Sequence, residues 1–77
     1  MYRIELAHSA AHELEKIFHV DHKLYDRLIA VMESLRENPY QGKKLKGKMK
    51  GDYSVRVGDY RIVYDIYREK LIIEVIS

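Results

Sequence analysis

Two arginines beside a predicted strand turn are the residues in this sequence best suited to chemistry on a phosphate. Arg56 and Arg61 flank the dipeptide Gly58-Asp59 within the segment YSVRVGDYRIVY. Gly-Asp is typical of a two-residue hairpin turn that accepts a positive φ at its first position, so both arginines are expected on one face of a strand pair. Their like charges repel unless an anion lies between them, and each guanidinium can donate a bidentate fork. The spacing fits a phosphate clamp, although two exposed arginines without a shared task are the more common arrangement on protein surfaces.

A run of lysines precedes this turn and makes the positive charge of the chain local. Residues 41–61 carry seven Lys or Arg and two Asp, whereas the remainder carries seven cations and ten anions, within a net charge of only +2. The lysines are Lys43, Lys44, Lys46, Lys48 and Lys50. Clustered cations favour a polyanionic partner through counterion release. A solvated edge strand that uses lysines to prevent aggregation is the alternative, and charge alone does not separate the two.

Four histidines form a second group of candidates. His8 and His12 are spaced i, i+4 near the start of a predicted helix, while His19 and His22 flank a predicted turn. Because no cysteine or carboxylate completes a recognisable ligand pattern, these side chains are more typical of solvated or capping histidines than of a metal site. The absence of cysteine excludes disulfides and thiolate chemistry and is compatible with a reducing cytosol. We expect no metal and no cofactor.

Two predicted helices must position these groups. Ser9 is a plausible N-cap for a helix over residues 10–18, whose apolar residues fall at helical spacing. Asp21 is a candidate N-cap for a second helix with a longer apolar stripe. This helix is expected to end near Asn38, because Pro39 disfavours helical geometry in the residue before it. The two helices are expected to form a hairpin.

The remaining pattern predicts five strands. They cover residues 1–6, an edge segment at 42–51, and then 53–57, 60–67 and 71–76. Parity directs Tyr53, Val55, Val57, Tyr60, Ile62 and Tyr64 toward the helices, and Ser54, Arg56 and Arg61 to the other face. The last strand is almost wholly apolar, which predicts a central position covered on both faces. The fold class is therefore α+β, with the helix hairpin on one face of a small, mainly antiparallel twisted sheet in the order β-α-α-β-β-β-β.

Size and hydropathy limit the class of protein. At 77 residues the chain is expected to form a single domain over residues 1–77 near the lower size limit for an independent core. No apolar run approaches the roughly 20 residues of a membrane span, and the N-terminus MYRIELAHS carries charges where a signal peptide needs apolar residues. We expect a soluble, cytoplasmic protein without a membrane partner.

The sequence also resembles a known family. The run NPYQGKKLKGKMKGDYSVRVGDYRIVYDI, the closing EKLIIEVIS and the predicted element order together resemble the RelE/ParE superfamily of bacterial and archaeal type II toxins, closest to its RelE branch. The most specific part is KLKG followed by YSVRVGDYRIVYDI, and the resemblance covers essentially the whole chain. It implies a small toxin that enters the ribosomal A site and cuts messenger RNA without a metal. It also implies neutralisation by a co-encoded antitoxin that wraps around the toxin.

The resemblance assigns roles to individual positions. Arg61 falls on the arginine of the family's YRxxY motif, and Arg56 falls on a basic strand position that contacts the scissile phosphate. These two are the implied catalytic residues. The implied RNA-binding residues are Lys43, Lys44, Lys46, Lys48, Lys50 and Ser54. Tyr40 and Tyr67 are candidates to stack on a base, although packing is the favoured interpretation for the tyrosines as a group.

Two departures from the family pattern reduce the expected activity. Ser54 stands where the best-characterised members carry a lysine. RelE-type chains usually continue past the last strand with a His/Lys-Arg segment and a tyrosine, whereas this sequence stops at Ser77. Metal-free RNA cleavage needs a base for the 2′-OH proton, and arginine, which holds its own proton tightly, hardly serves as one. We expect weak or no cleavage by this chain, with RNA or ribosome binding retained.

Two other functions remain open. The first is a ParE-like toxin that poisons DNA gyrase, which a longer helix hairpin would have favoured. The second is a truncated, non-toxic relative that only binds an antitoxin, for which exposed strand edges and apolar surface suffice. The lysine run and the arginine pair favour the ribosome and messenger RNA as partners, together with a cognate antitoxin.

Overall fold

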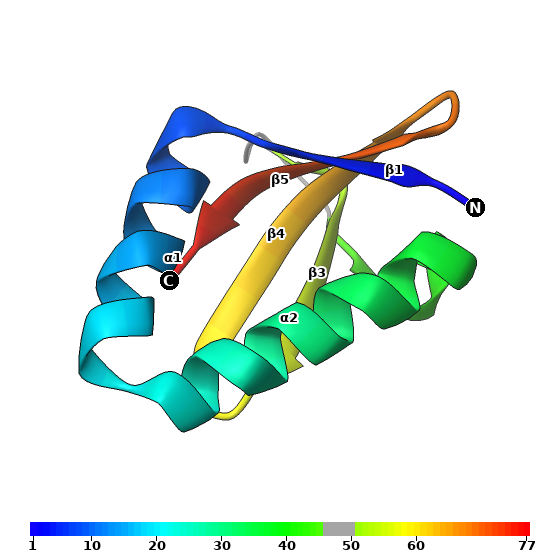
Figure 1. Cartoon of the computed structure of the whole chain (residues 1–77). Coiled ribbons are helices and arrows are strands. Elements are labelled where there is room, and N and C mark those ends of the chain that lie inside the picture. The colour runs from blue at the N-terminus through cyan, green and yellow to red at the C-terminus, as the bar shows by residue number, and fades with distance from the viewer. Residues whose placement is uncertain (46–50) are drawn as a thin grey trace.

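Among the residues that the structure describes, two helices cover one face of a five-stranded sheet (Figure 1). The structure is a computed structural model, and it describes residues 1–45 and 51–77. Its elements are β1 (Arg3–Leu6), α1 (His8–Val20), α2 (His22–Glu37), the 3-10 turn η1 (Pro39–Gln41), β2 (Lys43–Lys44), β3 (Tyr53–Val57), β4 (Tyr60–Tyr67) and β5 (Lys70–Ile76). The predicted α+β fold class is confirmed. None of the described helices combines the length and the apolar character that crossing a membrane requires.

The sheet has the strand order β1-β5-β4-β3-β2, with β1 parallel to β5 and every other pair antiparallel. The central position predicted for the last strand is confirmed, but its coverage on both faces was wrong. Leu71 and Ile73 are fully buried, whereas Ile72 and Val75 are only half-buried. The reason is that both helices lie on the same face, so alternate residues of β5 meet different surroundings.

The hydrophobic core fills the space between the helices and the sheet. Each helix contributes one apolar stripe, made of Ala10, Leu14 and Ile17 on α1 and of Leu28, Met32 and Leu35 on α2. The sheet contributes Val57, Ile62, Tyr64, Leu71, Ile73 and Ile76, with Tyr53, Val55 and Tyr60 packed at the margin. Burial of each Leu, Ile, Val or Met side chain contributes about 1.5–3 kcal/mol. The predicted apolar face of β3 and β4 is therefore confirmed.

Neighbouring residues predicted the start of the second helix but not the start of the first. The side chain of Asp21 accepts the Leu24 N–H at 3.1 Å, as expected of an N-cap. The predicted cap of the first helix was wrong, because α1 begins at His8 and Ser9 instead donates its hydroxyl to the Glu74 carbonyl at 3.1 Å. The Ala7 N–H donates to the Ile73 carbonyl at 2.8 Å, so pairing with β5 fixes where α1 begins.

The two helices follow one another with Asp21 as the single linking residue and meet at a corner (Figure 1). The second helix ends at Glu37, and the Asn38 N–H donates to the Ser34 carbonyl at 3.1 Å, as the proline at position 39 predicted. This arrangement places the start of α2 near the turn between β3 and β4, where Asp21, Leu24 and Tyr60 line one groove.

The strand segments differ in how well they were predicted. The bounds of β3 and β4 agree with the prediction, and Gly58 in the turn between them has a φ of +61°. The predicted edge strand over residues 42–51 is confirmed only as β2, which covers Lys43 and Lys44 and pairs with β3. The predicted sites Lys46, Lys48 and Lys50 lie outside the described residues.

Candidate nucleic-acid interface

Arg56 and Arg61 lie directly opposite one another on β3 and β4, and both are exposed. The Arg61 N–H donates to the Ser77 carbonyl at 2.6 Å, and the Arg61 carbonyl accepts the Ser77 N–H at 3.0 Å. Because the N–H and C=O of Arg61 both bond to Ser77, at the end of β5, they point away from β3. Arg56 and Arg61 are therefore a pair without main-chain hydrogen bonds between them. In such pairs the side chains approach most closely, with Cβ atoms about 4.5–5.5 Å apart.

The surroundings leave the charges of this pair available to an anion. The Arg56 Nε–H donates to the Gly58 carbonyl at 3.2 Å, which holds the guanidinium near the turn. Ion pairs elsewhere in the described part of the chain join Lys16 to Glu13, Arg36 to Glu33 and Lys70 to Glu5, and none of them includes Arg56 or Arg61. A guanidinium has five donors, so most of the N–H groups of both arginines stay free to bind phosphate oxygens.

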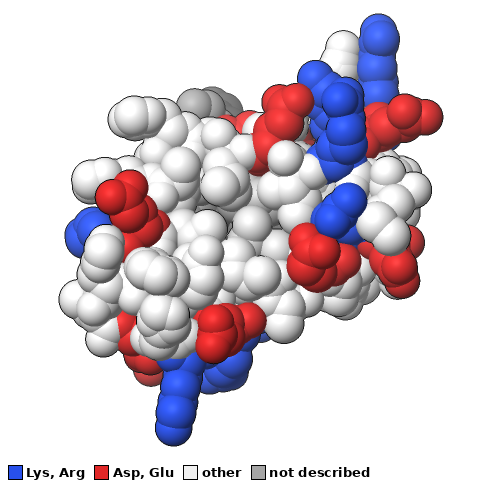
Figure 2. Space-filling view, viewed as in Figure 1, with Lys and Arg blue, Asp and Glu red and all other residues white. Residues whose placement is uncertain are grey.

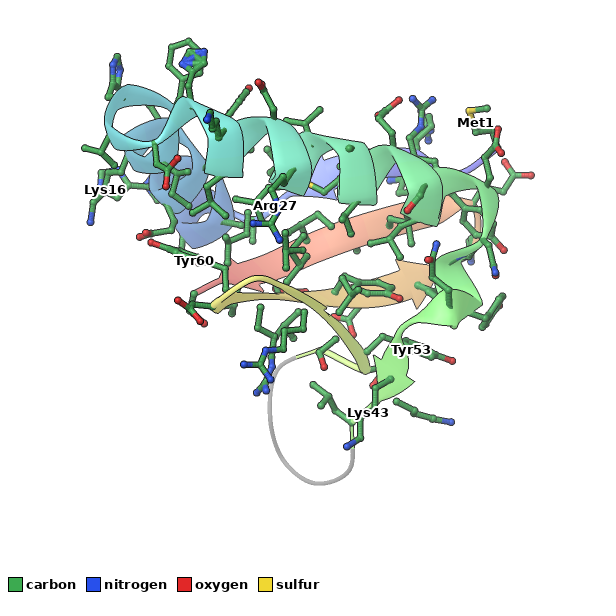
Figure 3. The ribbon with its side chains drawn as sticks, turned by 90° about the horizontal axis from the view of Figure 1, so that it is seen from below. Met1, Lys16, Arg27, Lys43, Tyr53 and Tyr60 are labelled. Carbon is green, nitrogen blue, oxygen red and sulfur yellow. The ribbon has the colours of Figure 1, made fainter. Side chains whose placement is uncertain are left out.

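The two described lysines of the predicted basic run lie on opposite faces. Lys43 is opposite Ser54 in the β2–β3 register, and Lys44 is opposite Tyr53. Residues that oppose one another in a ladder share a face, so Lys43 lies on the arginine face and Lys44 on the helix face. Figure 3 shows Lys43 on the side of the sheet away from the helices. The structure therefore brings Lys43, and not Lys44, to the face of Arg56 and Arg61.

Ser54 was expected to bind RNA, and its burial does not fit that expectation. Its side chain lies on the arginine face, as parity predicted, but the residue is only 7% exposed, and its partner Val63 is 5% exposed. Gly51 lies against Val63 so closely that a Cβ at this glycine would collide with the valine. The next residue, Asp52, donates its N–H to the Asp65 carboxylate at 2.8 Å. Residues 51 and 52 thus cross the sheet beside Ser54 on the face that carries Arg56 and Arg61, which we call the open face. Alternation within β3 cannot predict this long-range contact.

A third arginine near the turn was missed by sequence reasoning. Arg27 extends from α2 toward the β3–β4 turn (Figure 3), and a Cβ placed on Gly58 would lie 3.4 Å from its Nη1 atom. The Arg27 side chain lines a groove of about 490 Å³ between α2 and the turn, together with Asp21, Lys23, Leu24, Gly58, Asp59 and Tyr60. The charge count along the chain did not reveal Arg27, because tertiary packing brings α2 to the turn. The available signal was its spacing on the helix, three residues after Leu24 and four before Val31, which both pack against the core.

The tyrosines mostly serve packing. Rings of Tyr40, Tyr53 and Tyr64 follow one another, with the second and third stacked at a centroid distance of 5.6 Å. The Tyr64 hydroxyl donates to the Pro39 carbonyl at 2.7 Å, and burial raises the pKa of this fully buried residue. At the surface, the hydrogen bond between the Tyr2 and Tyr40 side chains raises the pKa of Tyr2. Tyr67, 48% exposed, shares the face of Arg61 by strand parity.

The histidines lie in the helix layer. His19 and His22 surround the exposed ring of Phe18, with ring centroids 5.4 and 4.5 Å away. No three His, Cys, Asp or Glu side chains within residues 1–45 and 51–77 are grouped so that they could hold a metal ion. His19 and His22 therefore form an aromatic corner with Phe18 and Tyr25, on elements other than the strands that carry the arginine pair.

The comparison with protein families decides the assignment. The sequence model described as the ParE toxin of type II toxin-antitoxin system, parDE, matches residues 4–77. This chain belongs to that family. It is a type II toxin of the RelE/ParE superfamily, as its sequence pattern implied. No curated protein sequence matches the toxin significantly.

Solved structures confirm the fold of the toxin. It is similar to the YoeB/ParE toxin from Agrobacterium tumefaciens, with a TM-score of 0.86 and 20% identity over 97% of this chain and 95% of that one. It is also similar to YoeB in a heterotetrameric YoeB-YefM complex from Staphylococcus aureus, with a TM-score of 0.82 and 21% identity over 96% and 92% of the two chains. A third similar structure is the YoeB dimer from the same organism, with a TM-score of 0.81 and 22% identity over 95% and 91%.

The site on the toxin is suited to charge stabilisation. Arg56 and Arg61 present donors on one face of the sheet, and Arg27 adds a guanidinium at the turn between their strands. Donors fixed in advance near a phosphate stabilise the negative charge that develops on it without reorganising. A guanidinium group has five N–H donors and no acceptor, so these residues can hold an anion but hardly accept a proton.

Proposed function

We propose that this toxin inhibits translation by acting on messenger RNA in the ribosome. The observation that carries the proposal is the exposed pair of Arg56 and Arg61, which oppose each other in register without an ion pair among the described residues. Lys43 adds a further cation on the same face. In this proposal a phosphodiester of the messenger lies between the two guanidinium groups, and its charge relieves their mutual repulsion.

Cleavage at this site would follow the metal-free route of RNA transesterification, which leaves a 2′,3′-cyclic phosphate and a 5′-hydroxyl. The 2′-oxygen attacks the neighbouring phosphorus, a new P–O bond forms, and the bond from phosphorus to the 5′-oxygen breaks. A base takes the 2′-OH proton and an acid protonates the leaving 5′-oxygen. Arg56 and Arg61 stabilise the charged phosphorane in this scheme, and one such donor is worth about 10²–10³ in rate.

We expect the cleavage step to be slow. The family position that carries a lysine is Ser54 here, and this serine is 7% exposed. A buried hydroxyl is a poor substitute for a mobile ammonium group as either acid or base. The proposed toxin therefore holds the messenger firmly and cuts it slowly, so that blocked elongation is its principal effect.

The proposed partner is a cognate antitoxin protein. The similar heterotetramer from Staphylococcus aureus is a YoeB-YefM toxin-antitoxin complex, and a further similar structure from that organism is also a YoeB-YefM complex. For this chain an antitoxin with acidic side chains would fit the Arg56 and Arg61 surface and compete with RNA for it. The cytoplasm is the proposed location, because ribosomes and messenger RNA are there.

A gyrase-directed toxin is the second candidate. The matching family model is that of the ParE toxin, which makes a ParE-like activity against DNA gyrase a specific alternative. Two assays separate the candidates, namely protein synthesis in a purified translation system and supercoiling by purified gyrase. We expect the toxin to inhibit translation at concentrations that leave supercoiling unchanged.

The variants Arg61→Ala and Lys16→Ala make the translation assay specific. Lys16 lies on α1 and forms an exposed ion pair with Glu13, so its removal is a matched loss of one surface cation. We expect Arg61→Ala to weaken inhibition strongly and Lys16→Ala to leave it unchanged. Inhibition of supercoiling alone would overturn the proposal in favour of gyrase. Binding to an antitoxin without inhibition of either process would favour a non-toxic relative.

A further inference from the structure

A second group of cations surrounds a cavity at the turn between β4 and β5. This cavity has a volume of about 520 Å³ and is lined by Arg3, Tyr67, Arg68, Glu69 and Lys70. Figure 2 shows Lys and Arg side chains gathered on the part of the surface where Figure 1 places this turn, with acidic side chains among them. The volume lies within the range of about 300–1,000 Å³ that is usual for small-ligand sites.

The strand register builds this site from three elements. Arg3 on β1 is opposite Lys70 on β5, and Lys70 is opposite Tyr67 on β4, so the three side chains form a row on the open face. The Arg3 N–H donates to the Glu69 carbonyl at 2.9 Å, which ties β1 to the turn. Lys70 forms an ion pair of 3.0 Å with Glu5. The charge of Lys70 is thus partly balanced, which leaves Arg3 and Arg68 as the main cations of the cavity.

Arg68 is the least expected residue at this turn. Its φ is +58°, in the left-handed region where glycine is favoured and where other residues are uncommon. Its guanidinium lies over the Tyr67 ring, 5.3 Å from the centroid. The side chain thus holds a flat cation on an exposed aromatic ring, and the outer face of such a guanidinium is a platform on which a base can stack.

The mixture of charges fits a nucleotide better than a bare anion. A phosphate needs a cation, which Arg3 supplies, and a base needs a flat platform, which Arg68 and Tyr67 supply. Carboxylates accept hydrogen bonds from the exocyclic amino groups of bases, so Glu69 suits the same ligand although it would repel a lone phosphate. One nucleotide therefore uses every kind of side chain that lines the cavity.

The position of the cavity relates it to the arginine pair. Arg61 and Tyr67 lie on the same face of β4 and are six residues apart, which corresponds to about 20 Å along a strand. Stacked nucleotides rise about 3.4 Å each, so about six of them span that distance. Between the two ends, Gly51 and Asp52 cover Val63 and Asp65 of β4. The path between them therefore runs along β5, where Val75 and Ile72 lie half-buried on the same face.

We propose that the cavity at the β4–β5 turn binds a second nucleotide of the RNA strand that Arg56 and Arg61 hold. The inference rests on the proposed action on RNA, and it extends the contact from one phosphate to a track along the open face of the sheet. Its consequence is a dependence on RNA length, because only a strand long enough to reach both ends gains the second contact.

The test is the affinity of the full chain for fluorescent single-stranded RNAs of about three and about ten nucleotides, lengths on either side of the six-nucleotide span. Arg68→Gly is the informative variant, because glycine accepts the positive φ and preserves the turn. We expect it to weaken binding of the long RNA about tenfold and that of the short RNA hardly at all. Lys16→Ala removes a surface cation that is paired with Glu13 on α1, away from both proposed sites, and is expected to bind both RNAs as the wild type does. Equal binding of the long RNA by the wild type and Arg68→Gly would overturn the proposal.

Two further variants separate this site from the arginine pair. Arg3→Ala is expected to reduce the slope of log affinity against log salt by about 0.7, the value for one lost contact to single-stranded phosphate. Arg61→Ala is expected to weaken the binding of both RNAs. If Arg61→Ala changes neither affinity while Arg68→Gly weakens the long RNA, the arginine-pair assignment fails and the second site stands. If Arg61→Ala weakens both and Arg68→Gly changes neither, only the second site fails.

Discussion

On β4, Ile62 and Tyr64 point into the helix layer and are fully buried, whereas Arg61 and Tyr67 of the same strand are exposed on the other face. The covered face contains apolar side chains and the Tyr64 hydroxyl, whose hydrogen bond to Pro39 satisfies it. The open face carries the arginines that we assign to RNA. Because side chains alternate along a strand, one set of β4 residues stabilises the fold and the other set is the one that we propose binds RNA. Substitutions on the two faces should therefore have separable effects.

The largest expected effect is on stability, from a substitution on the covered face. Ile73 on β5 is fully buried in the core between the helices and the sheet. Truncation in Ile73→Ala removes buried methyl groups and leaves a cavity, at a cost of about 2–5 kcal/mol in the free energy of unfolding. Urea denaturation followed by circular dichroism measures this loss. A loss below about 1 kcal/mol would show that the site collapses around the smaller side chain.

A smaller loss is expected for Tyr64→Phe. The substitution keeps the ring and removes the hydroxyl that donates to the Pro39 carbonyl at 2.7 Å. The buried carbonyl then lacks this donor, which costs about 1–3 kcal/mol. The same denaturation experiment checks it, with Tyr67→Phe as an exposed control that also loses a tyrosine hydroxyl. Equal stability of Tyr64→Phe and the wild type would mean that water replaces the lost donor.

Alkaline pH should act on the same residue. Burial raises the pKa of Tyr64 above its ordinary value of 10.0, because the neutral form is favoured in the core. The folded state therefore retains the phenol proton more strongly than the unfolded state. This contribution to stability is complete below pH 10 and is lost as the pH rises above it. Unfolding free energies measured across that pH should fall for the wild type and fall less for Tyr64→Phe. Parallel curves would contradict the role of this tyrosine.

The smallest effect on stability and on RNA affinity is expected for Arg27, which lies at the margin between the two faces of the sheet. Arg27 extends from α2 to the β3–β4 turn and forms no ion pair among the described residues. Arg27→Ala should change the free energy of unfolding by no more than about 0.5 kcal/mol, the range of ordinary surface substitutions. Its RNA affinity should fall severalfold, less than for Arg61→Ala, as anisotropy with a short RNA can measure. Wild-type affinity would place Arg27 outside the interface.

Local patterns predicted the covered face and missed part of the open one. Alternation in β3 and β4 and the Gly58-Asp59 turn are encoded by neighbouring residues, so those strands were predicted to the residue. The start of α1, by contrast, depends on the hydrogen bond from Ala7 to Ile73, a contact between distant segments. The half-exposed outer face of β5 depends on both helices lying on the other side, which an apolar run does not indicate.

The candidate site also has a part that neighbouring residues predict and a part that depends on tertiary contacts. Arg56 and Arg61 were predicted because a hairpin places them opposite each other by its own register. The burial of Ser54 depends on residues 51 and 52, which are tied to Tyr64 and Asp65 of β4, and the approach of Arg27 depends on the packing of α2. Sequence reasoning therefore predicted that the two arginines oppose each other, whereas the surroundings of the pair required the tertiary structure.

The central claim is that Arg56 and Arg61 act together on one phosphate of messenger RNA. The most direct measurement is a double-mutant cycle with Arg56→Ala, Arg61→Ala and the double variant, read as the rate of translation inhibition in a purified system. Because the two guanidinium groups share one anion, we predict that inhibition falls about tenfold or more in either single variant and that the double variant loses little beyond that. Losses that simply multiply would mean two independent cations, and unchanged inhibition in the double variant would contradict the account.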